Sequence, residues 1–130
     1  MANARILIAD DYEDNRELLR LMLETSGYHI EEARDGAECV QMAHSHQYDL
    51  ALIDLSMPIL DGWSVLQEIK STDGTRDLPC VAVTAFAADE DRRRALAAGF
   101  DAYLTKPYRS KDLLDLVASL LARRNGQQSS

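Results

Sequence analysis

The sequence lacks the basic surface that binding to nucleic acid requires. Its 130 residues include 14 lysines and arginines against 22 aspartates and glutamates, for a formal net charge of −8. Phosphate contacts need a basic patch, so we expect no nucleic-acid partner. The one basic run, 92–94, directly follows three acidic residues, and this pattern is typical of the solvated face of a helix.

Long apolar runs and closely spaced cysteines are also missing. No stretch approaches the roughly 20 apolar residues that a membrane-spanning helix needs, and no signal-peptide pattern opens the chain. The two cysteines, Cys39 and Cys80, lie far apart, inside apolar patterns and without metal-ligand spacing. They are predicted to be small core residues in a reducing compartment. We therefore expect a cytoplasmic protein without a membrane partner.

What the sequence does contain is a regular alternation of short apolar segments and amphipathic segments. The apolar segments, predicted to be strands, are Arg5–Ala9, His29–Ala33, Leu50–Asp54, Cys80–Thr84 and Ala102–Thr105. Apolar residues at helical spacing predict helices over 15–25, 37–46, 63–70 and 90–98, and a last helix with Ser110 as its N-cap. This alternation implies right-handed crossovers. The predicted fold class is α/β, a doubly wound (βα)5 domain with a parallel five-stranded sheet.

Several local signals predict where elements begin and end. Asp14 with Glu17 three residues later resembles a capping box at the start of the first helix. Gly27 and Gly99 follow the first and fourth helices as stop signals. The domain is expected to span residues 1–123, and the polar tail, 124–130, is predicted to be disordered.

Polar residues collect where four of the predicted strands end. They are Asp10 and Asp11, Asp54, Thr84 and Lys106. Ligands of an open parallel sheet bind beyond the carboxyl ends of its strands, so these side chains mark the candidate site. Adjacent carboxylates repel one another unless a cation joins them, and Mg²⁺ suits a site of few carboxylates, water and a phosphate oxygen. The alternation of side chains along a strand would point Asp10 and Asp11 to opposite faces of the sheet, so the chain must turn at these residues.

The same residue types suit phosphoryl transfer. A carboxylate such as that of Asp54 can be a nucleophile toward phosphorus as well as a metal ligand. Lys106 offers a positive charge, and Thr84 offers a hydroxyl donor, to phosphoryl oxygens. Phosphoryl transfer needs little beyond positioning and charge neutralisation, and these groups supply both.

The motifs at these positions resemble those of receiver domains of two-component response regulators, over essentially the whole chain up to about Arg123. They are the aspartate pair after the first strand, "DLSMP" from Asp54, "DG" at 61–62, "VTA" around Thr84 and "KP" at 106–107. The resemblance implies the flavodoxin-like strand order 2-1-3-4-5. It also implies that a histidine kinase or a histidine phosphotransfer protein phosphorylates Asp54.

The resemblance further implies a ligand set for Mg²⁺. Asp11 and Asp54 would ligate the ion directly, and Asp10 directly or through water. The backbone carbonyl of Ser56 would complete the protein ligands. Lys106 would contact the phosphoryl group, through a chain turn that contains a cis peptide bond between Lys106 and Pro107.

Thr84 and Tyr103 match the positions of the family's conformational switch. On phosphorylation the hydroxyl would move to a phosphoryl oxygen, and the aromatic ring would move into the space that it leaves. Ser56 and Phe86 would flank the phosphoryl group and tune its hydrolysis.

The implied function is a single-domain response regulator, which is not an enzyme beyond its own phosphorylation and dephosphorylation. It would signal by phosphorylation-dependent protein binding or pass the phosphoryl group on in a phosphorelay. The expected binding face is formed by the fourth helix, the fifth strand and the fifth helix, around Arg93, Tyr103, Tyr108 and Lys111.

Three alternatives remain at this point. The chain could be a receiver excised from a hybrid histidine kinase or a longer regulator. A Mg²⁺-dependent phosphatase with Asp54 as nucleophile would want a second aspartate at position 56, which is Ser56. A flavin carrier shares the predicted fold, but the acidic first loop would repel the flavin phosphate.

Overall fold

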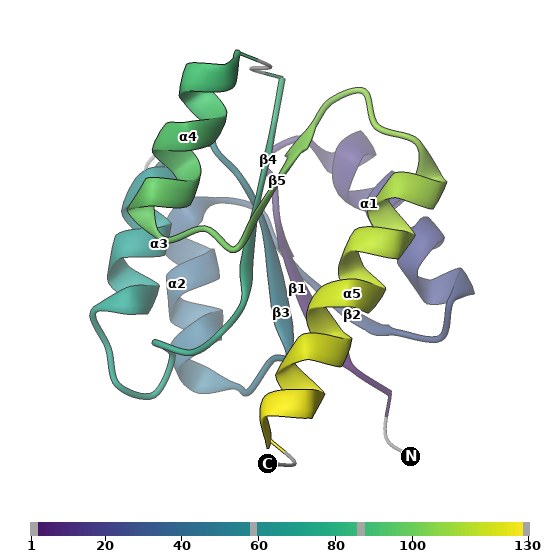
Figure 1. The fold of residues 1–130 in the computed structure, drawn as a ribbon, viewed down its shortest axis with the longest axis horizontal. Coiled ribbons are helices and arrows are strands. Elements are labelled where there is room, and N and C mark those ends of the chain that lie inside the picture. The colour runs from purple at the N-terminus through teal and green to yellow at the C-terminus, as the bar shows by residue number, and fades with distance from the viewer. Residues whose placement is uncertain (1–2, 58–59, 86–87, 129–130) are drawn as a thin grey trace.

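The computed structural model describes residues 3–57, 60–85 and 88–128, with side chains up to Arg123. Strands and helices alternate along the chain (Figure 1): β1 (Arg5–Ala9), α1 (Glu13–Thr25), β2 (His29–Ala33), α2 (Gly36–Ser45), β3 (Leu50–Asp54), α3 (Gly62–Lys70), β4 (Cys80–Thr84), α4 (Asp89–Ala98), β5 (Ala102–Thr105) and α5 (Ser110–Gln128). All five strands have the bounds that the sequence predicts.

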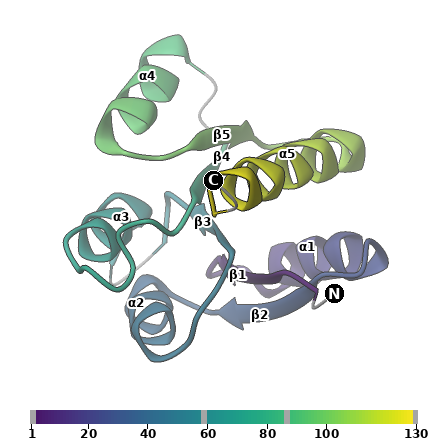
Figure 2. The same cartoon turned by 60° about the horizontal axis from the view of Figure 1, so that its bottom comes forward.

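The strands form one parallel sheet in the order β2-β1-β3-β4-β5. Helices α1 and α5 cover one face of the sheet, and α2, α3 and α4 cover the other (Figures 1 and 2). The predicted doubly wound (βα)5 architecture and its strand order are confirmed. The order reverses between β1 and β3, so the carboxyl ends of these two neighbouring strands form the crevice where such sheets bind ligands.

The core consists of two clusters, one on each face of the sheet. In β1, Ile6 and Ile8 belong to the cluster under α1 and α5, whereas Leu7 and Ala9 belong to the cluster under α2, α3 and α4. Successive side chains of a strand point to opposite faces. A strand buried on both faces must therefore be apolar throughout, which explains the unbroken apolar segments in the sequence.

Both cysteines lie in the cluster under α2, α3 and α4, as the sequence predicts for core residues. Cys39 of α2 and Cys80 of β4 are fully buried free thiols. Burial raises the pKa of each thiol to about 12, because the thiolate would lose its hydration.

The start of α1 differs from the prediction. The helix begins at Glu13 after Tyr12, which makes no side-chain capping bond, and Asp14 lies inside the first turn. The predicted capping box at Asp14 is therefore wrong. The backbone N–H of Tyr12 donates instead to Asp10 Oδ1 at 2.9 Å, so the turn before the helix is closed by the carboxylate of the first residue after β1. Acidic residues in the first turn still favour the helix through its dipole.

Helix α5 also departs from the predicted boundaries at both ends. Ser110 is the first helical residue, not the residue before the helix, and the backbone stays helical to Gln128. Residues 124–128, in the tail predicted to be disordered, thus belong to this helix. Within the described chain, neither α5 nor any other helix combines the length and apolar character needed to cross a membrane.

Candidate functional site

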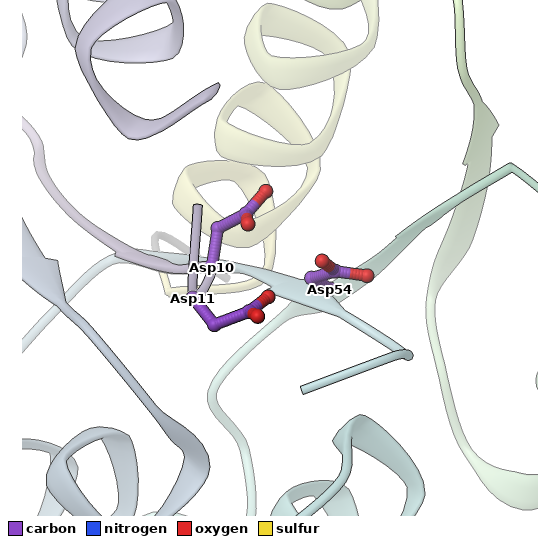
Figure 3. Close-up of side chains that lie close together, drawn as sticks. All are labelled: Asp10, Asp11 and Asp54. Atoms are coloured by element: carbon purple, nitrogen blue, oxygen red, sulfur yellow. The ribbon is translucent and has the colours of Figure 1, made fainter. Parts of the chain in front are cut away.

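Three carboxylates meet at the carboxyl edge of the sheet, where β1 and β3 end side by side (Figure 3). Asp10 and Asp11 follow β1, and Asp54 is the last residue of β3. One oxygen from each carboxylate lies within 4.8 Å of the others. Hydrogen-bonded parallel strands place their ends together, so this convergence follows from the strand order.

The two adjacent aspartates have different environments. Asp10 is 1% exposed, and its Oδ1 accepts the Tyr12 N–H. Asp11 is exposed, and among the described residues it has no hydrogen-bond or ion-pair partner. The regular strand stops at Ala9, and the chain bends at Asp11 before α1 begins. This bend lets both carboxylates lie beside Asp54 in spite of the alternation of side chains along a strand.

Lys106 bridges two of the carboxylates. Its Nζ lies 3.3 Å from Asp10 Oδ2 and 3.5 Å from Asp54 Oδ2. Its backbone N–H donates to the carbonyl of Thr84 at 2.7 Å, which fixes the turn after β5 to the end of β4. The bond between Lys106 and Pro107 is cis, as the resemblance implies.

Asp54 carries an unfavourable charge. It is 6% exposed, and burial raises the pKa of its carboxyl group, which the charges of Asp10 and Asp11 raise further. Two contacts oppose this: the Ser56 N–H donates to Asp54 Oδ1 at 3.0 Å, and Lys106 lies opposite Oδ2. One ammonium cannot offset three carboxylates, so the ionised cluster favours an additional cation.

Helix α3 begins at the "DG" motif, Asp61 and Gly62. Asp61 caps α3 by accepting the Ser64 N–H at 2.9 Å. A Cβ atom added at Gly62 would lie 2.6 Å from the Asp54 carbonyl oxygen, and only glycine fits such an approach. The "DG" motif of the sequence thus has two structural tasks, capping α3 and allowing its first turn to touch the end of β3.

The two predicted switch residues lie near the edge of the sheet, but their predicted motion is not tested by this geometry. Thr84 ends β4, one residue after Val83, which is the register partner of Asp54, and Thr84 is fully buried. Tyr103, on β5, is also buried, in the same cluster as Ala95 and Phe100. Its ring is therefore already inside in this structure, and burial raises the pKa of its phenol.

Ser56 and Phe86 are the two remaining residues that were predicted to flank the phosphoryl group. Ser56 is exposed, and it reaches the site through its backbone N–H, the bond to Asp54 described above. The predicted role of its carbonyl remains a prediction. Phe86 lies outside the described residues.

Sequence reasoning missed Arg16, a buried residue that contacts the site. Its Nη1 donates to the backbone carbonyl of Asp10 at 2.8 Å. Arg16 is buried in α1 together with Leu19 and Leu23, at positions i, i+3 and i+7 of one helical stripe. An arginine at a core-facing position of an amphipathic helix was the signal that could have identified it.

A groove of about 420 Å³ opens beside the cluster, between α1 and the turn into α5. Its lining includes Asp10, Asn15, Leu18, Lys106, Pro107 and Tyr108. Leu18 is 49% exposed there, so the groove offers apolar surface next to charged groups.

The donor set is chemically suited to a hard divalent cation. Carboxylate oxygens are preferred ligands of Mg²⁺ and Ca²⁺, and the three carboxylates are close enough to share one ion. The described residues thus combine a candidate cation site, a buried carboxylate and a positive side chain.

Comparisons with known proteins agree with this geometry. The family model of the response regulator receiver domain matches residues 6–118. The chain is 35% identical over 116 residues to the polar-differentiation response regulator DivK of Brucella anthropi, covering 89% of this chain and 94% of that protein. It is 38% identical over 128 residues to the response regulator MprA of Mycobacterium bovis, covering 98% of this chain and 55% of that protein.

Solved structures give the same result. The receiver domain of a sensor histidine kinase from Pseudomonas aeruginosa, solved with a magnesium ion in its active-site cleft, superposes with a TM-score of 0.86 at 33% identity. That match covers 93% of this chain and 99% of the other. The chain belongs to the family of receiver domains of two-component response regulators.

Proposed function

We propose that this receiver accepts a phosphoryl group on Asp54 from the phosphohistidine of a histidine kinase or a phosphotransfer protein, in a Mg²⁺-dependent reaction. The observation that carries the proposal is the meeting of three carboxylates with Lys106 at the switch point of the sheet. A carboxylate oxygen of Asp54 attacks phosphorus and the bond between phosphorus and the donor nitrogen breaks. The electron pair stays on the imidazole of the donor.

In this proposal the carboxylates hold the cation and Lys106 contacts the phosphoryl group. Asp11 and Asp54 would hold Mg²⁺ directly, Asp10 directly or through water, and the carbonyl of Ser56 would add a fourth oxygen. When bound, the ion would offset the carboxylate charges and draw charge from the phosphoryl oxygens. Lys106 lies 3.5 Å from Asp54 Oδ2, so its ammonium would contact a phosphoryl group on that carboxylate.

The groove between α1 and the turn into α5 supports access by a protein donor. Its lining includes Asp10 and Lys106 of the site, together with the exposed Leu18 and the half-buried Tyr108. A phosphohistidine on a partner helix needs both an opening to the carboxylate and apolar surface around it. We therefore place the phosphodonor over this groove.

The signal would leave through the face formed by α4, β5 and α5. Thr84 precedes the connection to α4, and Lys106 opens the connection to α5, so both helices are attached to residues of the site. A binding partner would then distinguish the two states at a surface around Arg93, Tyr108 and Lys111, with Tyr103 buried on β5. Differential affinity of about 5- to 150-fold is the usual range of such coupling.

Two settings for this receiver remain candidates. Nearly all of DivK, 94% of its length, aligns with this chain, which favours a single-domain regulator or a phosphorelay component. About half of MprA, 55% of its length, aligns with it, which favours a receiver within a longer regulator. The chemistry proposed for Asp54 is the same in both settings.

The phosphorylation proposal is tested with acetyl phosphate, which supplies a phosphoryl group without a partner protein. With Mg²⁺, intact-mass spectrometry should show one added phosphoryl group, which EDTA prevents and Asp54→Asn abolishes. Asp61→Asn is the matched control, because asparagine also caps a helix and should leave labelling unchanged. Label that persists in Asp54→Asn, or label that is stable in acid as phosphoserine is, would overturn the proposal.

A further inference from the structure

Arg16 is one of five polar or charged residues that are buried in the described part of the chain, and three of the others, Asp10, Asp54 and Thr84, form or adjoin the site. Arg16 is 8% exposed. A buried guanidinium needs partners for its donors, because an unpaired buried charge is strongly destabilising. The identity of those partners shows what the arginine holds in place.

Two hydrogen-bond partners hold the Arg16 guanidinium. Nε of Arg16 donates to Glu32 Oε1 on the edge strand β2 at 3.3 Å, and Nη1 donates to the Asp10 carbonyl at 2.8 Å. Glu32 also accepts from Arg20 Nη1 at 2.6 Å, so its charge already has a second cation. Neutralising Glu32 alone therefore does not account for a buried arginine at position 16.

The carbonyl that Arg16 holds belongs to the peptide group between Asp10 and Asp11. A peptide group is planar from one Cα atom to the next, so holding its oxygen sets the orientation of both residues at once. The same segment is held by the Asp10 N–H, which donates to the Ala33 carbonyl at 3.2 Å. Arg16 and β2 thus hold the backbone from which the two carboxylates extend.

We propose that Arg16 is a positioning residue of the cation site: anchored by Glu32, it fixes the peptide between Asp10 and Asp11 so that both carboxylates face Asp54. This inference rests on the proposed Mg²⁺-dependent function. Arg16 itself touches no reacting atom. It lowers the free-energy cost of arranging Asp10 and Asp11 when the ion binds.

Electrostatics and positioning predict opposite signs for the removal of Arg16. A positive charge near a cation site repels the cation, so its removal by charge alone would tighten Mg²⁺ binding. Loss of the hydrogen bond to the carbonyl would let the peptide rotate and weaken binding. Residues that orient metal ligands typically contribute 10- to 100-fold in affinity, so we expect Arg16→Met to bind Mg²⁺ about 10-fold more weakly.

Arg20→Met is the matched control. Arg20 lies one turn further along α1 and also pairs with Glu32, but it makes no contact with Asp10. Both variants remove one positive charge and one ion pair with Glu32. Arg20 is solvent-accessible, so its charge is screened at physiological salt, and Arg20→Met should change the Mg²⁺ affinity by less than about 2-fold.

The experiment is a Mg²⁺ titration of the full chain, followed by ¹H–¹⁵N NMR. It reports the dissociation constant and also the ¹⁵N shift of the Asp11 amide, which responds to hydrogen bonding at the preceding carbonyl. In Arg16→Met the Asp11 resonance should move before any Mg²⁺ is added, whereas in Arg20→Met it should not. If Arg16 had a purely structural role, Arg16→Met would lower the free energy of unfolding but would change neither the Mg²⁺ dissociation constant nor the Asp11 ¹⁵N shift.

Arg16→Lys keeps the inference testable if Arg16→Met does not fold. Lysine retains the charge, but a single ammonium does not reproduce the two fixed donors of the guanidinium, so Mg²⁺ binding should again weaken. Mg²⁺ affinity equal to or above that of the wild type in the folded variants would overturn the positioning role. If the wild type itself bound no Mg²⁺ at millimolar concentrations, the proposed function would fail instead.

Discussion

Nζ of Lys106, in the turn after β5, lies 3.5 Å from Oδ2 of Asp54 at the end of β3. Among the described residues, Lys106 carries the only ammonium group that forms an ion pair with the cluster. The three carboxylates of the cluster, when ionised, carry three negative charges. Lys106 therefore has two successive tasks in the proposed mechanism. It partly stabilises the acidic cluster at rest, and it would then contact the phosphoryl group on Asp54.

Asp54→Asn should stabilise the metal-free protein at neutral pH. Burial, with Asp10 and Asp11, raises the pKa of Asp54 in the folded state above its ordinary value of 3.8. Stability is therefore lost as the pH rises through that raised pKa, and asparagine removes this loss. We expect Asp54→Asn to raise the free energy of unfolding by about 0.5–2 kcal/mol at pH 7.

Urea unfolding across a pH series checks both the size and the sign of this effect. The difference between Asp54→Asn and the wild type should shrink toward zero as the pH falls below 3.8, where the carboxyl group is protonated in both the folded and unfolded states. A difference that grows as the pH falls would contradict the raised pKa.

Lys106→Met should destabilise the metal-free protein and increase its response to Mg²⁺. Removal of the ammonium leaves Asp10 and Asp54 without their cation, at a cost of about 1–3 kcal/mol for partly buried groups. The ion would then bind without a competing charge, so Mg²⁺ should raise the melting temperature more in Lys106→Met than in the wild type. Equal shifts in the two proteins would show that Lys106 does not interact with the cation site.

Asp10→Asn and Asp11→Asn should differ in stability while both weaken Mg²⁺ binding. Asp10 is buried and paired with Lys106, so asparagine loses a charge-assisted contact and stability falls. Asp11 is exposed, so its replacement relieves repulsion at little cost, and stability stays equal or rises slightly. Thermal unfolding in EDTA separates the two, and a larger loss in Asp11→Asn would contradict the assigned environments.

Thr84→Ala should separate binding at Asp54 from the response of the output face. Beryllofluoride, which mimics a phosphoryl group on a carboxylate, should bind this variant with Mg²⁺ and shift amide resonances near Asp10, Asp11 and Asp54. Shifts along α4, β5 and α5 should be smaller than in the wild type. Thr105→Ala is the control, since Thr105 pairs with Thr84 on the neighbouring strand. Undiminished distant shifts in Thr84→Ala would exclude the switch role.

The strands could be predicted from the sequence, most clearly β3 and β4, because burial on both faces leaves an apolar segment. Their order was implied by the resemblance to receiver domains. The ends of the strands also marked the site, since parallel strands bring their carboxyl ends together. Helix starts were less predictable. The turn before α1 is closed by Asp10 from the preceding strand end, and no local pattern around Asp14 reveals that contact.

The roles of Arg16 and Tyr103 could not be predicted from the sequence alone. The importance of Arg16 depends on a hydrogen bond to a backbone carbonyl, and side-chain motifs do not record such bonds. Tyr103 is buried in this structure, and its predicted movement into the space left by the Thr84 hydroxyl on phosphorylation stays a prediction. A rotamer equilibrium depends on small differences in packing, which a sequence pattern does not encode.

Chemical mapping of the acyl phosphate shows directly whether Asp54 is the residue that accepts the phosphoryl group. The protein is incubated with acetyl phosphate and Mg²⁺, reduced with borohydride and digested, and the peptides are sequenced by mass spectrometry. Reduction of an aspartyl phosphate yields homoserine, so we expect homoserine at position 54, and none when EDTA replaces Mg²⁺. Homoserine at position 10 or 11, or an unmodified position 54 in phosphorylated protein, would contradict it.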